Sequence, residues 1–154
     1  MLELGTACPD FSIALDNGDT FNSSDAQGQN LVVFFYPRAD TPGCTKESIA
    51  FSEHAAEFGM ANTRILGISK DTVAKQAKFR DKHNLTVMLG ADDQSNVCEQ
   101  FGVWQEKSMY GKTYMGIVRA TFLFNESGKL VHIWPKVKVA GHAEEVLEAV
   151  RSLS

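Results

Sequence analysis

One short stretch of the chain, residues 31 to 36, constrains the fold more than any other. It reads Leu31-Val32-Val33-Phe34-Phe35-Tyr36, an unbroken apolar run that is mostly β-branched or aromatic. The run is too short for a helix, and it lacks the alternation of a strand that has one face in water. It therefore predicts a strand that is buried on both faces.

The residues after this strand carry the start signals of a helix. Pro37 ends the strand because proline lacks an amide donor. Thr41 is a favourable N-cap, and Pro42 fits the first helical position. A stripe at helical spacing follows, formed by Cys44, Ser48, Phe51, Ala55 and Phe58.

Cys44 is the first candidate for chemistry, because this register makes it the third residue of the helix. The free amides and the positive end of the helix dipole favour its thiolate form. A free cysteine is only about 3 per cent ionised at pH 7. A helix end contributes at most about 2 kcal/mol, so we also expect a nearby cation. The alternative is a buried, inert thiol that fills the helix end.

Composition excludes several classes of function. The 154 residues are enough for one domain, 1–154, and contents of 44% hydrophobic and 22% charged residues are typical of a globular protein. A net charge of −4 without a basic block argues against nucleic acid as a partner. No apolar run approaches ~20 residues and no signal-peptide pattern is present, so we expect no membrane partner and a cytoplasmic location.

The cysteines and histidines indicate neither a disulfide framework nor a metal site. Cys8, Cys44 and Cys98 form no Cys-x-x-Cys pair, and the four histidines have no metal-ligand spacing. We therefore expect no metal.

The remaining patterns alternate between strands and helices. The predicted strands cover residues 11–15, 31–36, 64–69, 85–89, 117–124 and 129–134. The predicted helices cover residues 42–58, 73–83, 92 or 93 to 101, and 142–153. This order predicts an α/β fold of the thioredoxin-like kind, a mixed central sheet flanked by helices on both faces.

Arg119 is out of character in the apolar run of residues 117–124. A guanidinium cannot be neutralised, so an arginine in a central strand needs an anion or exposure to water. One interpretation is an edge-strand arginine in solvent. The other is that Arg119 reaches across the end of the sheet to the Cys44 thiolate and supplies the missing cation.

Together these residues resemble a known family. The spacing Pro37-x-x-x-Thr41-x-x-Cys44 is the peroxiredoxin motif. Residues 36–47 resemble the Q-type peroxiredoxins, also called bacterioferritin comigratory proteins. The likeness continues at residues 98–104, 116–119 and 136–142, and so spans nearly the whole chain.

The resemblance implies a thiol-dependent peroxidase that reduces hydrogen peroxide and organic hydroperoxides without metal, haem or flavin. Cys44 would be the peroxidatic nucleophile, which becomes a sulfenic acid. Thr41 would hold the thiolate and the peroxide, and Pro37 would shield the sulfur from water. Arg119 would stabilise the charge that develops as the O–O bond breaks.

Two further residues of the site follow from the resemblance. The amides of Gly43 and Cys44 would bind the peroxide oxygens, as an oxyanion is bound. Glu47 would orient Arg119, or it would be an exposed acid in the first turn of the helix.

The chain departs from the family in the second half of the reaction. Relatives commonly carry a resolving cysteine either five residues after the peroxidatic one or in the following helix, and those positions here are Ile49 and Arg80. Cys98 is interpreted as a packed core thiol, and nothing brings Cys8 near Cys44, although both stay candidates for a resolving cysteine. We therefore predict a one-cysteine cycle with an external thiol, such as thioredoxin, glutaredoxin or glutathione.

Two functions of other classes compete with this prediction. A peroxide-sensing or chaperone-like interaction protein would use Cys44 as a redox switch. An inert thioredoxin-fold binding module would not need Cys44 at all. For the oligomeric state, the resemblance suggests a monomer or a weak dimer.

Overall fold

The apolar strand of the sequence lies inside a seven-stranded mixed sheet. In the computed structural model, which describes residues 1–153, strand β3 (Asn30–Phe35) is buried along its whole length. It pairs in parallel with β4 (Thr63–Ser69) and antiparallel with β8 (Ala120–Phe124). Since it has a neighbour on each side, its backbone groups are satisfied within the sheet, and the predicted doubly buried strand is confirmed.

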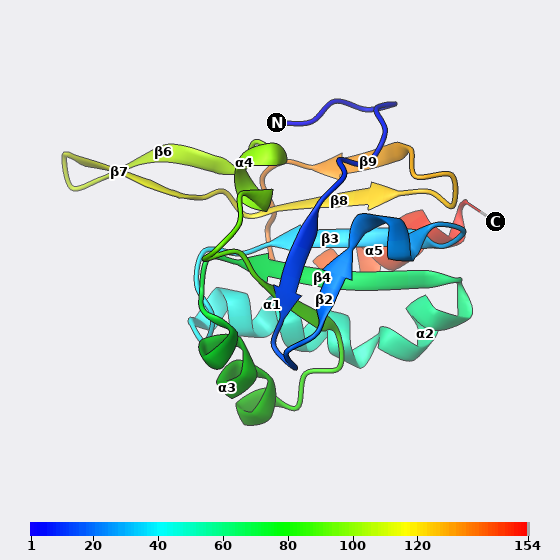
Figure 1. The fold of residues 1–154 in the computed structure, drawn as a ribbon, viewed down its shortest axis with the longest axis horizontal. Helices are drawn as coiled ribbons and strands as arrows, with labels where there is room; N and C mark the ends of the chain where they lie inside the picture. The colour runs from blue at the N-terminus through cyan, green and yellow to red at the C-terminus, as the bar shows by residue number, and fades with distance from the viewer. Residues whose placement is uncertain (154) are drawn as a thin grey trace.

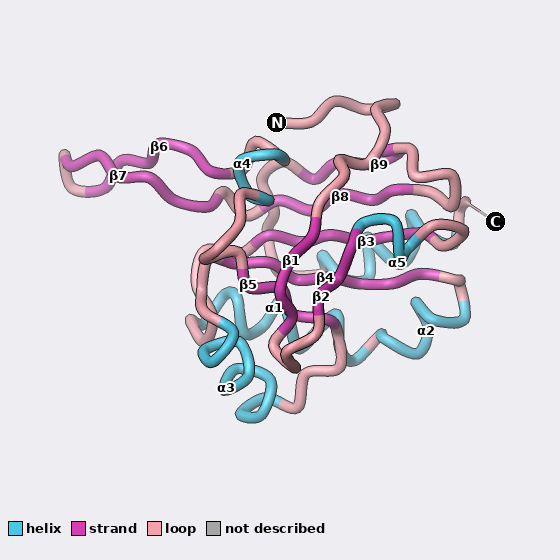
Figure 2. Tube along the Cα trace, in the orientation of Figure 1, coloured by secondary structure: helices cyan, strands magenta, loops and turns pink. Residues whose placement is uncertain are grey.

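The sheet has the order β2-β1-β5-β4-β3-β8-β9. The remaining strands are β1 (Ser12–Leu15), β2 (Thr20–Asn22), β5 (Met88–Ala91) and β9 (Leu130–Trp134). The β3–β4–β5 part is parallel, whereas β1, β8 and β9 add antiparallel neighbours. This is the expected thioredoxin-like arrangement (Figures 1 and 2).

The longer helices cover one face of the sheet. They are α1 (Pro42–Glu53), α2 (Ala55–Met60), α3 (Val73–His83) and α5 (His142–Arg151). Their buried side chains pack against Val32, Phe34 and Tyr36. We call this side of the sheet the helical face.

The opposite face carries Val33 and Phe35, because successive strand residues point to opposite sides. The two short helices η1 (Ser23–Ala26) and α4 (Val97–Gln100) cover it, together with residues near the N-terminus. The sheet therefore separates two hydrophobic clusters. Within residues 1–153, no helix has the length and apolar character needed to cross a bilayer.

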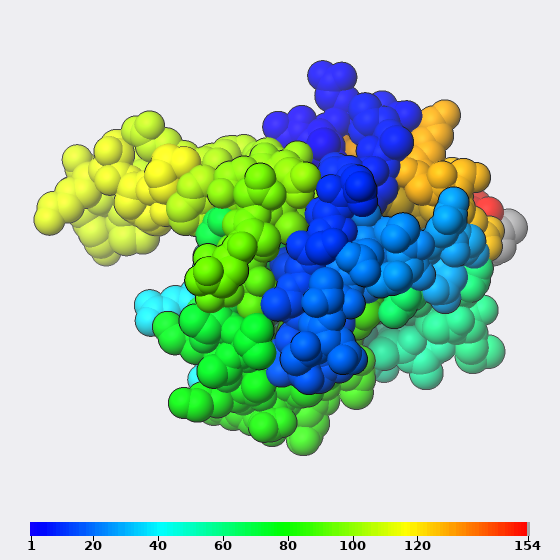
Figure 3. All heavy atoms as spheres, viewed as in Figure 1, coloured from blue at the N-terminus to red at the C-terminus, as the bar shows by residue number. Residues whose placement is uncertain are grey.

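A two-stranded hairpin, β6 (Trp104–Met109) and β7 (Lys112–Ile117), was not predicted. It projects from the body of the molecule, as Figures 1 and 3 show. Most of its residues are exposed, and polar and apolar side chains follow one another without the regular alternation by which a half-buried strand is recognised. The predicted strand over residues 117–124 is wrong in its extent, because residues 118 and 119 form a link between β7 and β8.

Three other predicted elements differ from the structure by more than one or two residues at an end. The helix over residues 42–58 is divided at His54, whose amide bonds to the carbonyls of both Ala50 and Phe51. The helix expected from residue 92 or 93 begins only at Val97. The carboxylate of Asp92, which precedes the helix in the sequence, accepts hydrogen bonds from the first amides of the helix.

The strand predicted over residues 85–89 covers Met88–Ala91 instead. The carbonyls of Leu85 and Val87 accept hydrogen bonds from the Arg80 guanidinium, at 2.6 and 2.7 Å, rather than from a neighbouring strand. An arginine side chain thus replaces strand pairing at the start of this segment.

Candidate active site

Cys44 lies in the first turn of α1, where the end of β3 delivers the chain to the edge of the sheet. Thr41 is the N-cap, Pro42 is the first helical residue and Cys44 is the third. The Cys44 side chain is almost fully buried, with 1% of its surface exposed, on the helical face. The predicted register of the helix start is confirmed.

Thr41 occupies the capping position without capping. Its hydroxyl donates to the carbonyl oxygen of Arg38, at 2.8 Å, and accepts no bond from the helix. Among residues 1–153, the amides of Gly43 and Cys44 have no hydrogen-bond acceptor. The first turn therefore keeps two free donors beside the sulfur, a suitable arrangement for an anionic oxygen.

Arg119 joins two acidic groups of α1. Its Nη2 donates to Cys44 Sγ at 3.2 Å, and its Nη1 donates to Glu47 Oε1 at 2.8 Å. The link between β7 and β8 places the guanidinium here, so two segments far apart in sequence meet at the side chain of Arg119. The solvent-exposed alternative for Arg119 is wrong.

Glu47 is buried, with 1% exposure, so the alternative of an exposed helix acid is also wrong. Burial raises the pKa of its carboxyl to about 7, although the charge and hydrogen bond of Arg119 act in the opposite direction. Its Oε2 has no hydrogen-bond partner among the described residues. Glu47 thus holds the guanidinium through one oxygen only.

Gly43 gives the guanidinium its space. A Cβ at this position would lie 3.2 Å from Arg119 Nη2, closer than an ordinary van der Waals contact. The family resemblance assigns Gly43 a role through its amide only. The absence of a side chain at Gly43 also matters, because it leaves space for the Arg119 guanidinium. The only indication in the sequence is that a glycine directly precedes the cysteine.

A buried polar network connects the loop between β3 and α1 to the end of β4 and to α3. The Tyr36 hydroxyl donates to Gln76 Oε1 at 2.7 Å, and Gln76 Nε2 donates to Ser69 Oγ at 3.1 Å. Ser69 in turn donates to Asp71 Oδ2, which also accepts the Ala39 amide at 2.7 Å. Sequence reasoning missed this network. Its one signal was a polar Gln76 on the inner face of a predicted helix.

Pro37 lies two residues beyond the end of β3, after Tyr36, and is exposed. Its ring lies on the segment that connects the buried Tyr36 to the loop before Thr41. The structure thus places the three residues of the peroxiredoxin motif, together with the distant arginine, at one end of β3.

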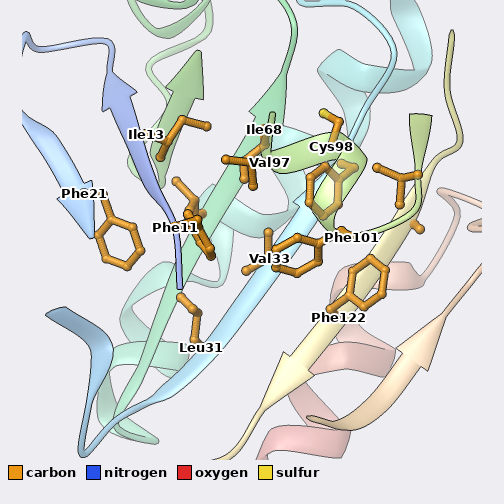
Figure 4. Close-up of a cluster of buried hydrophobic side chains, with 14 of the residues drawn as sticks. Phe11, Ile13, Phe21, Leu31, Val33, Ile68, Val97, Cys98, Phe101 and Phe122 are labelled. Carbon is orange, nitrogen blue, oxygen red and sulfur yellow. The ribbon is translucent and has the colours of Figure 1, made fainter. Parts of the chain in front are cut away.

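Cys98 and Cys8 belong to the cluster on the opposite face of the sheet. Cys98 is buried among apolar side chains near Phe101 (Figure 4), and burial raises its pKa. Cys8 is partly buried, and burial, with a smaller contribution from Asp10, raises its pKa to about 11. All three cysteines are free. The sheet lies between both of these thiols and Cys44.

Arg80 is a structural side chain of α3. Its guanidinium binds both carboxylate oxygens of Asp16, in addition to the carbonyls of residues 85 and 87. It therefore ties the helix to the turn between β1 and β2 and to the start of β5. Within the part of the chain that the structure describes, no group of three or more His, Cys, Asp or Glu side chains could hold a metal ion.

Known proteins resemble this chain over most of its length. The model of the AhpC/TSA family matches residues 4–133. "Putative peroxiredoxin bcp" of Coxiella burnetii is 42% identical over 146 residues, which cover 95% of this chain and 97% of that protein. "Peroxiredoxin Bcp" of Bacillus subtilis is 40% identical over 153 residues, which cover 99% of this chain and 98% of that protein.

A solved structure of the Xanthomonas campestris bacterioferritin comigratory protein matches the fold. It has a TM-score of 0.91 and 40% sequence identity, and the match covers 99% of this chain and 98% of that one. That structure is of a trapped intermediate/ligand complex and bears on the alkyl peroxide reduction activity of the Xanthomonas protein.

Proposed function

This chain belongs to the AhpC/TSA family as a Q-type peroxiredoxin, a thiol-dependent peroxidase, and we propose that it is a one-cysteine enzyme whose Cys44 is recycled by an external thiol. The observation that carries the proposal is the contact of Arg119 Nη2 with Cys44 Sγ at 3.2 Å, in a helix turn with free amides. A charged donor at this distance favours the thiolate, which is the reactive form of cysteine.

In the proposed first step, the Cys44 thiolate attacks one oxygen of a hydroperoxide. A sulfur–oxygen bond forms and the O–O bond breaks, so the sulfur is oxidised to sulfenic acid and the peroxide is reduced to water or an alcohol. The leaving oxygen carries negative charge until it takes up a proton. Arg119 and the free amides of the first turn stabilise that charge.

Thr41 has a defined part in this step. Its hydroxyl hydrogen is committed to the Arg38 carbonyl, so the oxygen is left to accept a hydrogen bond from the incoming peroxide. We assign Pro37 the role of limiting the access of water at the mouth of the site. The substrates we propose are hydrogen peroxide and organic hydroperoxides, in line with the alkyl peroxide reduction described for the Xanthomonas protein.

In the second half of the cycle, an external thiol attacks the sulfenic sulfur. Water leaves and a mixed disulfide forms, and a second thiol then releases reduced Cys44 as the two external sulfurs join. The sheet between Cys44 and the other cysteines supports this route, since a disulfide requires Cα atoms within about 7 Å. The second position at which relatives carry a resolving cysteine is Arg80 here, and its side chain is bound to Asp16 and to two backbone carbonyls. This also supports the route through an external thiol.

The reductant we propose is a small thiol or a dithiol protein, for example glutathione, glutaredoxin or thioredoxin. The cycle requires a reducing compartment, in line with the three free cysteines. We therefore propose a cytoplasmic location.

The test of the one-cysteine cycle uses the reduced protein and one equivalent of hydrogen peroxide under native conditions. We expect a mass increase of one oxygen on the peptide that contains Cys44, and no internal disulfide. A Cys8→Ser, Cys98→Ser double variant should still turn over peroxide with dithiothreitol. A disulfide between Cys44 and either other cysteine would overturn the proposal.

Steady-state turnover separates this enzyme from a peroxide sensor with the same cysteine. With excess thiol the enzyme consumes many equivalents of peroxide, whereas a sensor stops after about one.

A further inference from the structure

The loop that joins β3 to α1 holds a residue other than glycine in a left-handed conformation. Asp40, directly before the N-cap Thr41, has a φ of 62°. Aspartate enters this region more readily than most side chains, but it needs contacts from its surroundings to stay there. The contacts that hold Asp40 therefore also set the course of the backbone into Thr41.

The last turn of α3, which lies beside this loop in Figure 1, supplies those contacts. Asp40 Oδ2 accepts a hydrogen bond from Lys82 Nζ at 2.9 Å, and Asp40 Oδ1 lies 2.8 Å from His83 Nε2. Since a carboxylate can only accept, the ring nitrogen is the donor. The hydrogen bonds from Lys82 and His83 hold the pKa of the Asp40 carboxyl below its ordinary value. One carboxylate thus joins the active-site loop to a separate helix.

His83 is the more rigid of the two partners. Its side chain is 20% exposed, and its ring packs edge-on against the buried Phe79, with ring centroids 5.6 Å apart. The Lys82 side chain, by contrast, is 62% exposed and carries its charge on a flexible stem. His83 therefore sets where the Asp40 carboxylate can lie, and Lys82 adds a second hydrogen bond.

Packing alone does not fix the loop against α3. A cavity of about 460 Å³ lies between them, lined by residues 38–40 of the loop and by side chains of α3. Two polar contacts hold the loop here, one at the Asp40 carboxylate and one at the Ala39 amide, which donates to Asp71 at 2.7 Å. Side-chain hydrogen bonds thus do much of the work that continuous packing would otherwise do.

The position of the Thr41 hydroxyl depends on the backbone at Asp40. This hydroxyl donates to the carbonyl oxygen of Arg38 at 2.8 Å, so donor and acceptor lie on either side of Asp40 in the chain. A different backbone conformation at Asp40 would move the one relative to the other. The oxygen of this hydroxyl is the atom to which we assign the binding of the incoming peroxide.

We propose that Asp40 is a positioning residue, and that its contacts with His83 and Lys82 fix the Thr41 hydroxyl for the incoming peroxide. The inference rests on the proposed peroxidase function and extends it to α3. It predicts that two properties of the site can be separated. The binding of peroxide depends on the contact between Asp40 and α3, whereas the reactivity of the Cys44 sulfur towards other reagents does not.

The test removes the contact from each side. Glycine adopts a positive φ without strain, so Asp40→Gly removes the carboxylate and adds no steric conflict. Tyr110→Gly is the matched control, because Tyr110 has a φ of 53° and is 97% exposed at the tip of the hairpin. His83→Leu removes the ring donor and keeps an apolar side chain beside Phe79, whereas His83→Gln restores a donor.

Two rates are measured at pH 7 for each variant, in a Cys8→Ser, Cys98→Ser background that confines alkylation to Cys44. One is the reaction of the reduced protein with hydrogen peroxide. The other is the alkylation of Cys44 by iodoacetamide, which carries no peroxide O–H for Thr41 to accept. Urea unfolding establishes that each variant is folded under these conditions.

In Asp40→Gly the peroxide rate constant should fall roughly tenfold, as for a slightly misplaced positioning group, while alkylation stays within about twofold of the parent. His83→Leu should lose roughly threefold, because Lys82 remains, and His83→Gln should recover much of that loss. The Asp40→Gly, His83→Leu double variant should be no slower than Asp40→Gly, since both changes remove one contact. Tyr110→Gly should match the parent in both rates.

Three results would overturn the inference. They are a parent-like peroxide rate in Asp40→Gly, losses that multiply in the double variant, and an equal fall in both rates, which would indicate a general disturbance of the site. A parent protein that is alkylated at Cys44 but does not react with hydrogen peroxide would instead overturn the proposed function, and the inference with it.

Discussion

Arg119 divides its guanidinium between a sulfur and a carboxylate, and this geometry explains why the residue must be arginine. The planar fork offers two parallel donors to Cys44 and Glu47, whereas a lysine ammonium is a point charge. The fork also needs the backbone surface of Gly43 below it. Three residues of α1 are therefore matched to one side chain from a distant link.

Arg119→Met should lower the second-order rate constant for hydrogen peroxide by roughly 10²–10³-fold, the cost of removing one preorganised charged donor. Arg119→Lys should recover only part of the rate, because it keeps the charge and loses the fork. Stopped-flow measurement of the reduced protein at pH 7 tests both. Equal rates in wild type and Arg119→Met would contradict the role of this residue.

Gly43→Ala places a methyl group 3.2 Å from Arg119 Nη2. The guanidinium must move by a few tenths of an ångström, so we expect the peroxide rate to fall about tenfold while the fold is kept. Gly59→Ala is the matched control, since a Cβ at Gly59, inside α2, meets nothing within 4 Å. That variant should keep full activity and gain about 0.5–1 kcal/mol in stability. A fully active Gly43→Ala would show that the close approach is irrelevant.

Glu47 makes stability depend on pH with a defined sign. Its pKa rises from 4.5 to about 7 on folding, so the folded state binds more protons than the unfolded state between these values. The free energy of unfolding therefore falls as pH rises through this window. Up to roughly 2–3 kcal/mol is lost by pH 8.

Glu47→Gln should remove this loss. Urea unfolding at pH 5 and pH 8 measures it, and the decrease between the two should be smaller in the variant. All other titrating groups are common to both proteins, so their contributions cancel in the comparison. The same decrease in both proteins would count against a buried, proton-binding Glu47.

At the scale of single residues, the sequence offered the contact of Arg119 with Cys44 as one of two interpretations, and the family resemblance favoured it; the structure confirms the contact. The sequence did not predict the close approach of Arg119 to Gly43, because that contact joins residues far apart in the sequence and no local pattern indicates it.

The elements were predictable where their apolar pattern was strong. β3 and the start of α1 follow their predicted registers, since burial and capping signals agree there. The β6–β7 hairpin was missed because it packs against little and needs no apolar face. β5 was displaced because Arg80 satisfies the carbonyls that strand pairing would otherwise serve.

Arg80→Met should therefore destabilise the fold without directly changing the residues that carry out the proposed reaction. It leaves Asp16, which is almost fully buried at its side chain (5% exposed), and two carbonyls without their donor. We expect a loss of roughly 3–5 kcal/mol in the free energy of unfolding, as for a broken buried ion pair. Lys82→Met, on the exposed side of α3, should cost less than about 1 kcal/mol. Urea unfolding compares the two, and an equal loss would refute the structural role of Arg80.

At the scale of the whole molecule, the Cys44 sulfur is kept apart from the other two thiols. Cys44 lies on the helical face, and Cys8 and Cys98 lie across the sheet. The alternation of β3 makes this separation, since Val32 and Val33 point to different clusters. The sequence predicted a mixed central sheet and a packed Cys98, but it did not predict that the sheet would lie between Cys44 and the other two thiols. The projecting hairpin also required the structure.

The most direct test of the account is the rate constant of the reduced protein with hydrogen peroxide, measured from pH 5 to 9. A thiolate held by a helix end and a guanidinium should give a rate that has levelled off by pH 7, far above that of free cysteine. A rate that keeps rising about tenfold per pH unit through pH 8 would mean that Cys44 reacts as an ordinary thiol, and it would contradict the account.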